Sequence, residues 1–230
     1  MEQATCHGNS PMISCSVAVS RLRPLPLSFY RRPAEEVARE LLGRWLVREL
    51  AGERLVLRLV ETEAYLGAPD RASHAWGGRR TPRTESLYLP GGHAYVYFIY
   101  GMHFCLNAVT GESEIGSAAL LRAGEPVEGE ERMRENRGWT RPPRPGDLAG
   151  GPGKLCQALG IGRELDGVLL DRPPLWIARG EPVDPDEIVA GPRIGVDYAG
   201  EAAQWPLRFA VRGNRHVSRP WPERANGSPL

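Results

Sequence analysis

Residues 44–65 restrict the fold of this chain more than any other stretch. Two strand-like runs, 44–50 and 55–65, are joined by a short connection that contains Ala51-Gly52-Glu53. Two such runs joined by a short, glycine-containing connection are typical of an antiparallel β-hairpin. The sequence therefore predicts a sheet in which strands that follow one another in the chain lie side by side.

The rest of the chain predicts more strands than helices. Aromatic and β-branched residues over 94–109 predict a second hairpin, interrupted at Gly101-Met102, a pair that suits a two-residue turn. The Gly-, Pro- and Arg-rich stretch 67–92 predicts a long loop or short helices, and loops of that length are usually functional. Proline, acidic first-turn residues or apolar stripes predict short helices, and short runs of strand-forming residues predict further strands. The helices are predicted at 33–43, 126–137 and 154–159, and the strands at 117–123, 167–170, 175–178, 193–197 and 207–211.

These elements predict an α+β fold, a single mixed domain with a mainly antiparallel β-sheet and flanking helices. The chain shows no internal repeat and no interdomain linker. We expect a leader at residues 1–26, where Ser, Pro and Arg replace any periodic pattern, one domain at 27–218, and a tail at 219–230.

Composition excludes several classes of protein. The longest apolar run is interrupted by Gly101, His103 and Asn107 and falls short of the ~20 residues that a membrane-spanning helix needs. The chain does not open with a basic segment followed by a long apolar stretch, so we expect no secretory signal and a cytoplasmic protein. The cysteines show no CxxC spacing, so the sequence indicates neither a zinc site nor a disulfide framework.

The charge is nearly balanced overall, at +1, but unbalanced locally. The stretch 71–83 holds four arginines and no acid, and 208–224 holds five arginines against Glu223 alone. A polyanion could bind such a basic face on a nearly neutral protein. Charge alone leaves open the alternative of arginines scattered over a solvated surface.

Glu61 and Glu63 are candidates for catalysis. If the strand 55–65 alternates without interruption, both carboxylates lie on the same side as its three leucines and are buried beside them. Such burial raises the pKa of a carboxyl toward a range useful for general acid or base catalysis. Two alternatives remain open. Both residues could be solvated beyond the buried part of the strand, or they could form a retaining-glycosidase pair, although both would then approach a sugar from one side.

Tyr100 immediately precedes the predicted turn of the second hairpin, where an aromatic side chain would project into solvent. An exposed aromatic residue near arginines suits base stacking or insertion into a duplex, although aromatic residues on strands more often belong to the core. His74 is ambiguous by itself. The glycine-rich run before Lys154 does not form a triphosphate-binding loop, because Leu148 and Leu155 replace residues that the motif needs.

Four blocks of the sequence are informative together. They are Val60-Glu61-Thr62-Glu63-Ala64-Tyr65, Gly77-Gly78-Arg79-Arg80-Thr81-Pro82-Arg83, Tyr97-Phe98-Ile99-Tyr100-Gly101-Met102 and Gly151-Pro152-Gly153-Lys154-Leu155-Cys156-Gln157-Ala158-Leu159. In this order and spacing the chain resembles the alkyladenine (3-methyladenine) DNA glycosylase family from about Tyr30 to Ser218. The resemblance implies a single domain built on a curved antiparallel sheet. It also implies an enzyme that flips a damaged nucleotide out of DNA and cleaves its N-glycosidic bond with water.

The resemblance also implies roles for residues in catalysis and base binding. Glu63 matches the family's general base, which activates the attacking water. Arg122 matches the arginine near the flipped nucleotide, placed to hold that water or a phosphate. Tyr65, His74 and Tyr97 match the walls that enclose the flipped base.

Other matched residues are implied to contact the duplex or to select the base. Tyr100 matches the residue inserted into the gap that the flipped nucleotide leaves. Asn107 matches the residue that disfavours guanine through its exocyclic amino group. From their charge, we expect Arg79, Arg80 and Arg83 to contact the DNA backbone.

The resemblance predicts a monofunctional DNA-3-methyladenine glycosylase of base-excision repair, which leaves an abasic site. We expect a monomer that acts on double-stranded DNA containing damaged purines, in the cytoplasm at the nucleoid, with no metal or other cofactor and no membrane. A lyase reaction through the Lys154 amine has no counterpart in the resemblance. Two alternatives stay open: a non-catalytic damaged-DNA binding module, which would not require Glu63, and a carbohydrate-directed glycoside hydrolase, which would require a second carboxylate.

Overall fold

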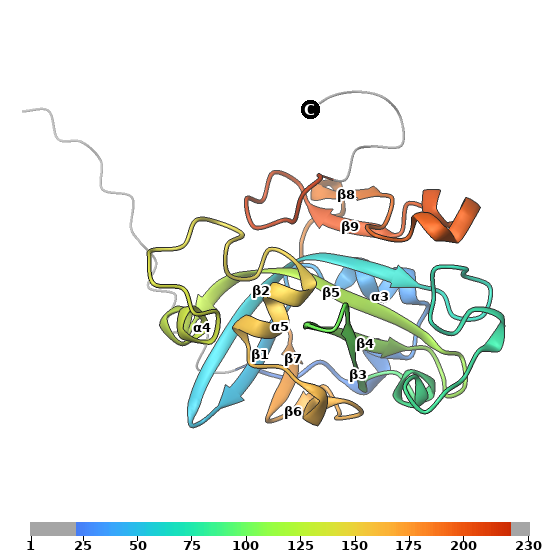
Figure 1. Cartoon of the computed structure of the whole chain (residues 1–230), viewed down its shortest axis with the longest axis horizontal. Helices are drawn as coiled ribbons and strands as arrows, with labels where there is room; N and C mark the ends of the chain where they lie inside the picture. Colours follow the sequence, from blue (N-terminus) through green and yellow to red (C-terminus); the bar gives the residue numbers. More distant parts are fainter. Residues whose placement is uncertain (1–21, 222–230) are drawn as a thin grey trace, which may run out of the picture.

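Nine strands form one sheet in the computed structural model, which describes residues 22–221. They are β1 (Trp45–Leu50), β2 (Glu53–Tyr65), β3 (Ala94–Ile99), β4 (His103–Thr110), β5 (Ser117–Glu128), β6 (Asp171–Arg172), β7 (Leu175–Ala178), β8 (Ile188–Gly191) and β9 (Arg208–Val211). The strand order is β3-β4-β5-β2-β1-β7-β6, while β9 pairs with both β2 and β8. Every pairing is antiparallel. In Figure 1 the long strands β2 and β5 curve across the molecule, so the predicted α+β fold with a curved antiparallel sheet is confirmed.

Short helices cover the sheet and fill its connections. The α-helices are α2 (Leu27–Tyr30), α3 (Ala34–Glu40), α4 (Glu130–Asn136) and α5 (Pro152–Ala158), and the 3₁₀ helices are η1 (Trp76–Gly78), η2 (Glu85–Tyr88), η3 (Arg163–Leu165), η4 (Pro185–Glu187) and η5 (Asp197–Gln204). Within residues 22–221, no helix combines the length and the apolar character that crossing a membrane requires.

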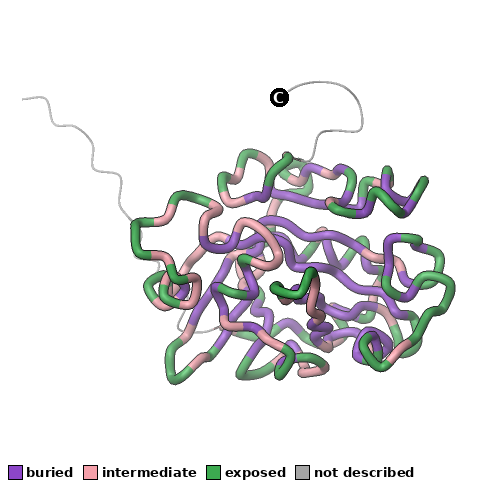
Figure 2. The backbone as a smooth tube through the Cα atoms, in the orientation of Figure 1, coloured by how far each residue is buried: buried purple, intermediate pink, exposed green. Residues whose placement is uncertain are grey.

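Helix α3 packs against one face of β2, and the two form part of the main core. It begins directly after Pro33 and carries two glutamates in its first turn, which interact favourably with the helix dipole. Val37 and Ala38 are fully buried. The hydroxyl of Thr62 on β2 donates a hydrogen bond of 2.7 Å to the Ala38 carbonyl, so the Thr62 side chain faces α3. Figure 2 shows the central strands buried along most of their length and the loops at their ends exposed.

A β-bulge changes which face of β2 points toward that core. The pairing with β5 shifts its register between Leu59 and Glu61, which leaves Val60 as an extra residue. Leu59, before the bulge, belongs to the core that α3 covers, and Thr62, after it, also faces α3. The inward positions therefore change from odd to even numbers, and Glu61 and Glu63 point to the opposite side of the sheet. The expectation of one unbroken alternation through the strand is wrong, because the bulge adds a residue.

Both predicted hairpins are present, but the turn of the second is shifted by one residue. Tyr100 and Gly101 occupy its centre with φ angles of +54° and +68°. The Met102 N–H donates to the Ile99 carbonyl at 3.2 Å, which closes the turn. Positive φ at both central residues defines the turn that matches the twist of a hairpin, and a bulky residue rarely adopts it. Tyr100 therefore lies in the turn itself and not before it.

One predicted helix begins too early, and two predicted strands are wrong. Pro126 lies within β5, and α4 begins only after Gly129, whose φ of +77° ends the strand. The register of β2 and β5 shifts opposite this region, so the missing proline N–H is accommodated at an irregularity. Residues 167–170 and 193–197 are not strands, because turns at Gly167 and Gly195, both at positive φ, interrupt them.

Most of the predicted leader and tail lies outside the described residues, and the domain boundaries stay a prediction.

Candidate active site

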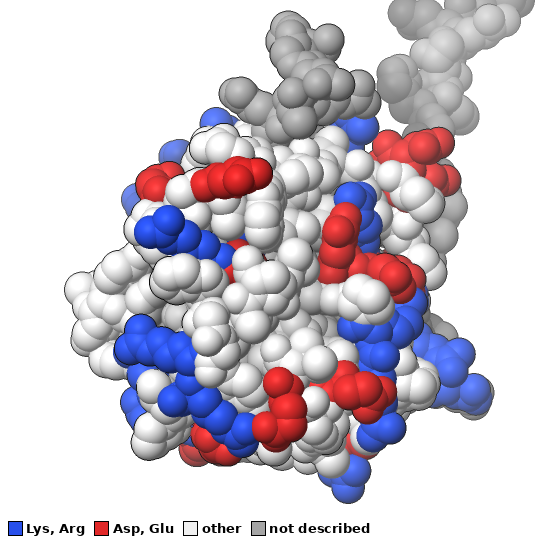
Figure 3. Space-filling view, turned by 90° about the vertical axis from the view of Figure 1, so that its right-hand side faces the viewer, with Lys and Arg blue, Asp and Glu red and all other residues white. Residues whose placement is uncertain are grey.

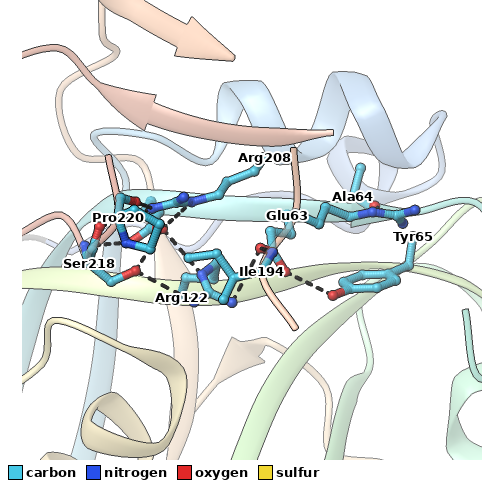
Figure 4. A network of polar contacts seen from close by, with 10 residues as sticks. Glu63, Ala64, Tyr65, Arg122, Ile194, Arg208, Ser218 and Pro220 are labelled. Atoms are coloured by element: carbon cyan, nitrogen blue, oxygen red, sulfur yellow. Dashed lines mark hydrogen bonds and ion pairs between the residues drawn. The ribbon is translucent and has the colours of Figure 1, made fainter. Parts of the chain in front are cut away.

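Glu63 lies at the centre of a buried group of hydrogen-bond donors. Its side chain is fully buried. One carboxylate oxygen lies 3.2 Å from Nη1 of Arg122 and accepts the Ile194 N–H at 2.9 Å. The other accepts the Tyr65 hydroxyl at 2.8 Å (Figure 4). All three partners are donors, which is the arrangement that a carboxylate accepts.

The neighbours of Glu63 respond to burial and to its charge. Burial, and next the charge of Glu63, raise the pKa of the Tyr65 hydroxyl well above its usual value, so this phenol stays protonated and donates. Burial alone would lower the pKa of Arg122, but the charges of Glu63 and Glu61 outweigh it and raise that pKa above its ordinary value. Arg122 is therefore a fixed positive charge beside the carboxylate.

Glu61 is equally buried but is fully occupied by other groups. It accepts hydrogen bonds from Nε of Arg208 at 2.6 Å and from Nε of Arg122 at 3.2 Å. Ser218 adds its N–H at 2.8 Å and its hydroxyl at 2.9 Å. The interpretation of Glu61 and Glu63 as solvated residues is wrong, because β2 is flanked here by both β5 and β9. Arg122 lies between the two carboxylates, because its Nε donates to Glu61 and its Nη1 lies 3.2 Å from Glu63.

A cavity of about 590 Å³ opens beside this group. It lies between the end of β2, the β3–β4 hairpin, the start of α5 and residues 194–198. Six residues singled out from the sequence line it: Tyr65, His74, Tyr97, Tyr100, Asn107 and Arg122. The volume falls within the range of small-molecule sites in proteins.

Aromatic rings form one wall of this cavity. The rings of His74 and Tyr97 meet edge to face with centroids 4.6 Å apart, and Tyr95 and Tyr97 stack at 5.4 Å. Nδ1 of His74 lies 2.8 Å from the Tyr95 hydroxyl, which fixes the orientation of the imidazole. Tyr95 was not among the predicted site residues. Its alternation with Tyr97 along β3 was the signal for a shared aromatic face.

His74 is held in its neutral form. Burial, followed by the nearby charges of Arg83 and Arg79, lowers the pKa of its imidazole below the usual value. A neutral imidazole keeps one donor and one acceptor nitrogen. Since Nδ1 is paired with Tyr95, Nε2 is the nitrogen that remains for a bound molecule.

Asn107 is oriented by the strand next to it. It pairs directly with Tyr95 across the β3–β4 ladder, and its side-chain N–H donates to the Tyr95 carbonyl at 3.1 Å. The side chain is almost completely buried and borders the cavity. Its amide can therefore neither rotate nor withdraw without breaking a buried hydrogen bond.

The residues expected to contact DNA lie on the outer surface near the cavity. Tyr100 is 77% exposed at the tip of the β3–β4 hairpin, on the rim of the cavity. Arg80 is engaged by Glu85 and Glu114, and Arg83 donates to the Phe98 carbonyl.

A buried ion pair that sequence reasoning missed supports the site. Arg193 and Asp70 are both fully buried and form two hydrogen bonds, one of 2.9 Å between Nη2 and Oδ1. Arg193 also donates to the Ala64 carbonyl at 2.9 Å and lies over the Tyr65 ring, 4.7 Å from its centroid. This pair fixes the backbone next to Ile194, whose N–H contacts Glu63. No local pattern relates residues so far apart in the sequence.

Lys154 lines the cavity edge at the start of α5, where its ammonium group donates to the Gly146 carbonyl at 3.3 Å. Among residues 22–221, His, Cys, Asp and Glu side chains form no group of three or more that could hold a metal ion.

Comparison with known proteins relates this arrangement to one family. The sequence profile of methylpurine-DNA glycosylases matches residues 28–215. A Myxococcus xanthus protein provisionally named 3-methyladenine DNA glycosylase is 51% identical over 195 residues, which cover 85% of this chain and 93% of that protein. A Methanocella arvoryzae protein with the same provisional name is 50% identical over 196 residues, 85% of this chain and 96% of its own length. The human DNA-3-methyladenine glycosylase is 46% identical over 207 residues, 86% of this chain and 68% of the human protein.

Proposed function

This chain belongs to the methylpurine-DNA glycosylase family, and we propose that it excises alkylated purines from DNA with Glu63 as the base that activates water. The observation that carries the proposal is the position of Glu63. It is a buried carboxylate whose three partners, Tyr65, Arg122 and Ile194, line an aromatic cavity, and the Arg122 guanidinium lies 3.2 Å from it. The enzyme is a monofunctional N-glycosyl hydrolase of base-excision repair, whose product is an abasic site.

The cavity takes the flipped nucleotide. Extrusion of a base costs a few kcal/mol, and stacking of the base on aromatic side chains offsets that cost. Tyr65, His74 and Tyr97 present such surfaces, and all three are held by hydrogen bonds or ring contacts before any ligand arrives. Lesions that stack or pair poorly are extruded most easily and are therefore preferred.

The hydrolytic step follows from the position of Glu63. The carboxylate takes a proton from a water molecule while the water oxygen forms a bond to C1′ of the sugar. The C1′–N bond breaks, and its electron pair leaves with the base, which neutralises the positive charge of an alkylated purine. Arg122 holds the water or a phosphate next to this centre. A single well-placed carboxylate suffices because alkylation makes the purine a better leaving group.

Selection and binding use the remaining residues. Asn107, fixed by the Tyr95 carbonyl, disfavours the exocyclic amino group of guanine. Tyr100 enters the gap left in the duplex. Arg79 and Arg83 contact phosphates, and Arg80 does so only by exchanging its carboxylate partners, Glu85 and Glu114, for a phosphate. The monomeric state and the cytoplasmic location stay predictions.

The occupation of Glu61 favours this proposal over a carbohydrate hydrolase. A glycosidase needs two carboxylates that reach its substrate. Glu61 accepts four hydrogen bonds, and two of the residues that donate them, Arg208 and Ser218, lie outside the cavity lining. All three residues that hold Glu63 line the cavity, which favours Glu63 as the single carboxylate of the reaction.

Replacement of Glu63 by glutamine tests the proposal. We expect Glu63→Gln to slow single-turnover excision of 3-methyladenine by about 10²–10⁴-fold, the usual contribution of a general base, while lesion binding is largely retained. Glu40→Gln is the matched control, because Glu40 pairs with Arg32 on the surface, outside the cavity.

Excision by Glu63→Gln within a few-fold of the parent would show that the base is wrongly assigned. A parent protein that binds lesion-containing DNA but excises none of the lesions would instead support the non-catalytic binding module.

A further inference from the structure

A second groove, of about 450 Å³, adjoins the base cavity. Ser73, His74 and Tyr198 line both, so the two are continuous. The groove continues over the loops between β2 and β3, and the residues specific to its lining include Trp76 and Arg79. None of the roles proposed above for catalysis or base selection uses this groove.

The groove is basic and contains no acid. Arg71, Arg79 and Arg83 line it, and no Asp or Glu does. The contrast with Arg80 is direct, because that side chain is engaged by two glutamates and lies outside the lining. Figure 3 shows the side of the molecule that carries these loops, where one group of basic side chains borders an uncharged area. Such a surface complements a chain of phosphates.

Two exposed aromatic side chains flank the same groove. Trp76 is 51% and Tyr198 is 64% exposed, although aromatic rings of this size are normally buried. The Arg71 guanidinium lies over Trp76 at 5.4 Å from the ring centroid, and the Tyr198 hydroxyl donates to the Ala72 carbonyl at 3.4 Å. Both rings are therefore held in place while much of their surface stays open to a ligand.

Aromatic rings beside arginines that no carboxylate engages are the features that bind single-stranded nucleic acid without regard to sequence. We propose that this groove binds the nucleotide next to the extruded one when that neighbour is unpaired. Its base stacks on Trp76 or Tyr198, and Arg79 and Arg83 hold its phosphate. The inference rests on the proposed function, since it places the neighbour relative to a lesion in the base cavity. In an intact duplex the neighbouring base stays paired, so only its phosphate reaches the groove.

The inference predicts a selective effect of two substitutions. Stacking on an aromatic side chain contributes about 1–3 kcal/mol per base, which corresponds to roughly 5- to 150-fold in affinity. We expect Trp76→Ala to weaken binding to a single-stranded lesion oligonucleotide within this range and to change duplex binding less than twofold. Tyr198 also lines the base cavity, so Tyr198→Ala should weaken single-strand binding within this range and duplex binding to a smaller extent. Ile115→Ala is the matched control, since Ile115 is 50% exposed but lines neither cavity.

An abasic neighbour makes the test specific. Dissociation constants are measured by fluorescence anisotropy for strands with the lesion flanked by normal nucleotides, or by a tetrahydrofuran abasic analogue on the 5′ or the 3′ side. When the analogue replaces the neighbour that occupies the groove, the parent protein should bind the strand more weakly. The variant that binds the normal strand more weakly than the parent should lose no further affinity when this neighbour is abasic. The inference is overturned if a variant loses the same affinity for strands with and without the neighbouring base. It is also overturned if neither variant loses affinity for the single strand.

The outcome also separates the two proposals. If the parent excises alkylated purines but the abasic-neighbour comparison shows no coupling, the groove inference alone fails. If the parent excises none, the proposed function fails, and the groove inference fails with it.

Discussion

Glu61→Gln is expected to destabilise the protein strongly, although Glu61 does not take part in the proposed reaction. Its carboxylate accepts four hydrogen bonds from Arg122, Arg208 and Ser218, and its side chain is fully buried. The neutral amide of glutamine leaves the buried Arg208 guanidinium without its anionic partner and turns an NH₂ group toward other donors.

The size of the effect follows from the cost of breaking a buried ion pair. Removal of one partner costs about 3–5 kcal/mol, out of a total of about 5–15 kcal/mol for a typical domain. The free energy of unfolding falls by about 3 kcal/mol for each molar of urea at the upper end for small proteins. The urea concentration at the unfolding midpoint should therefore fall by roughly 1–1.7 M. Tryptophan fluorescence follows the transition, because the chain has six tryptophans.

The control is the same substitution at a surface pair. Glu40 forms two hydrogen bonds with Arg32, at 2.8 and 2.9 Å, but its side chain is 48% exposed. Such pairs contribute about 0–1 kcal/mol, so Glu40→Gln should hardly move the midpoint. Equal midpoints for the two variants would refute the reasoning and would show that the Glu61 network contributes no net stability. Under conditions where Glu61→Gln is folded, its excision rate should fall much less than that of Glu63→Gln.

Three further outcomes are expected. The product should be an intact abasic strand that breaks only with alkali or heat, and borohydride should trap no covalent adduct; trapping that disappears in Lys154→Ala would contradict the assignment of water as nucleophile. Tyr100→Asn should keep or strengthen the hairpin, because asparagine tolerates the φ of +54°, yet lower excision from duplex more than from single-stranded DNA; equal losses on both substrates would contradict insertion into the duplex. An NMR titration should place the pKa of His74 below the 6.5 of a free histidine, and Arg83→Gln should raise it. Because the unfolded chain then binds this proton more readily, His74 contributes stability above pH 6.5 that is lost as the pH falls toward its folded pKa, and His74→Gln should remove that part of the pH dependence.

Local patterns in the sequence predicted which strands and helices form, but they did not predict the detailed geometry of these elements. The two hairpins and α3 follow from alternation, turn residues and a helix-starting proline, all of which act within a few residues. The bulge at Val60 has no such signal, and it decides on which side of the sheet Glu63 lies. Pro126 was misleading because a proline that suits a helix start also fits an irregular position in a strand.

The candidate site shows the same division. Tyr97 and Asn107 lie on paired strands of one hairpin, so their proximity is a local property of the sequence. The pairing of Asp70 with Arg193 depends on the tertiary fold, and no spacing rule relates the two. The distinction between Glu61 and Glu63 likewise requires knowing which partners each one has already bound.

The order in which the chain is synthesised gives the Glu61 network a further consequence. Glu61 and Glu63 leave the ribosome early, but Ile194, Arg208 and Ser218, which hold them, leave it much later. Until then Arg122 lacks its fixed position between two anchored carboxylates. A nascent chain therefore carries Glu63, the proposed base, before the groups that hold it have been made, and the proposed centre is complete only when residues 194–218 have joined β2.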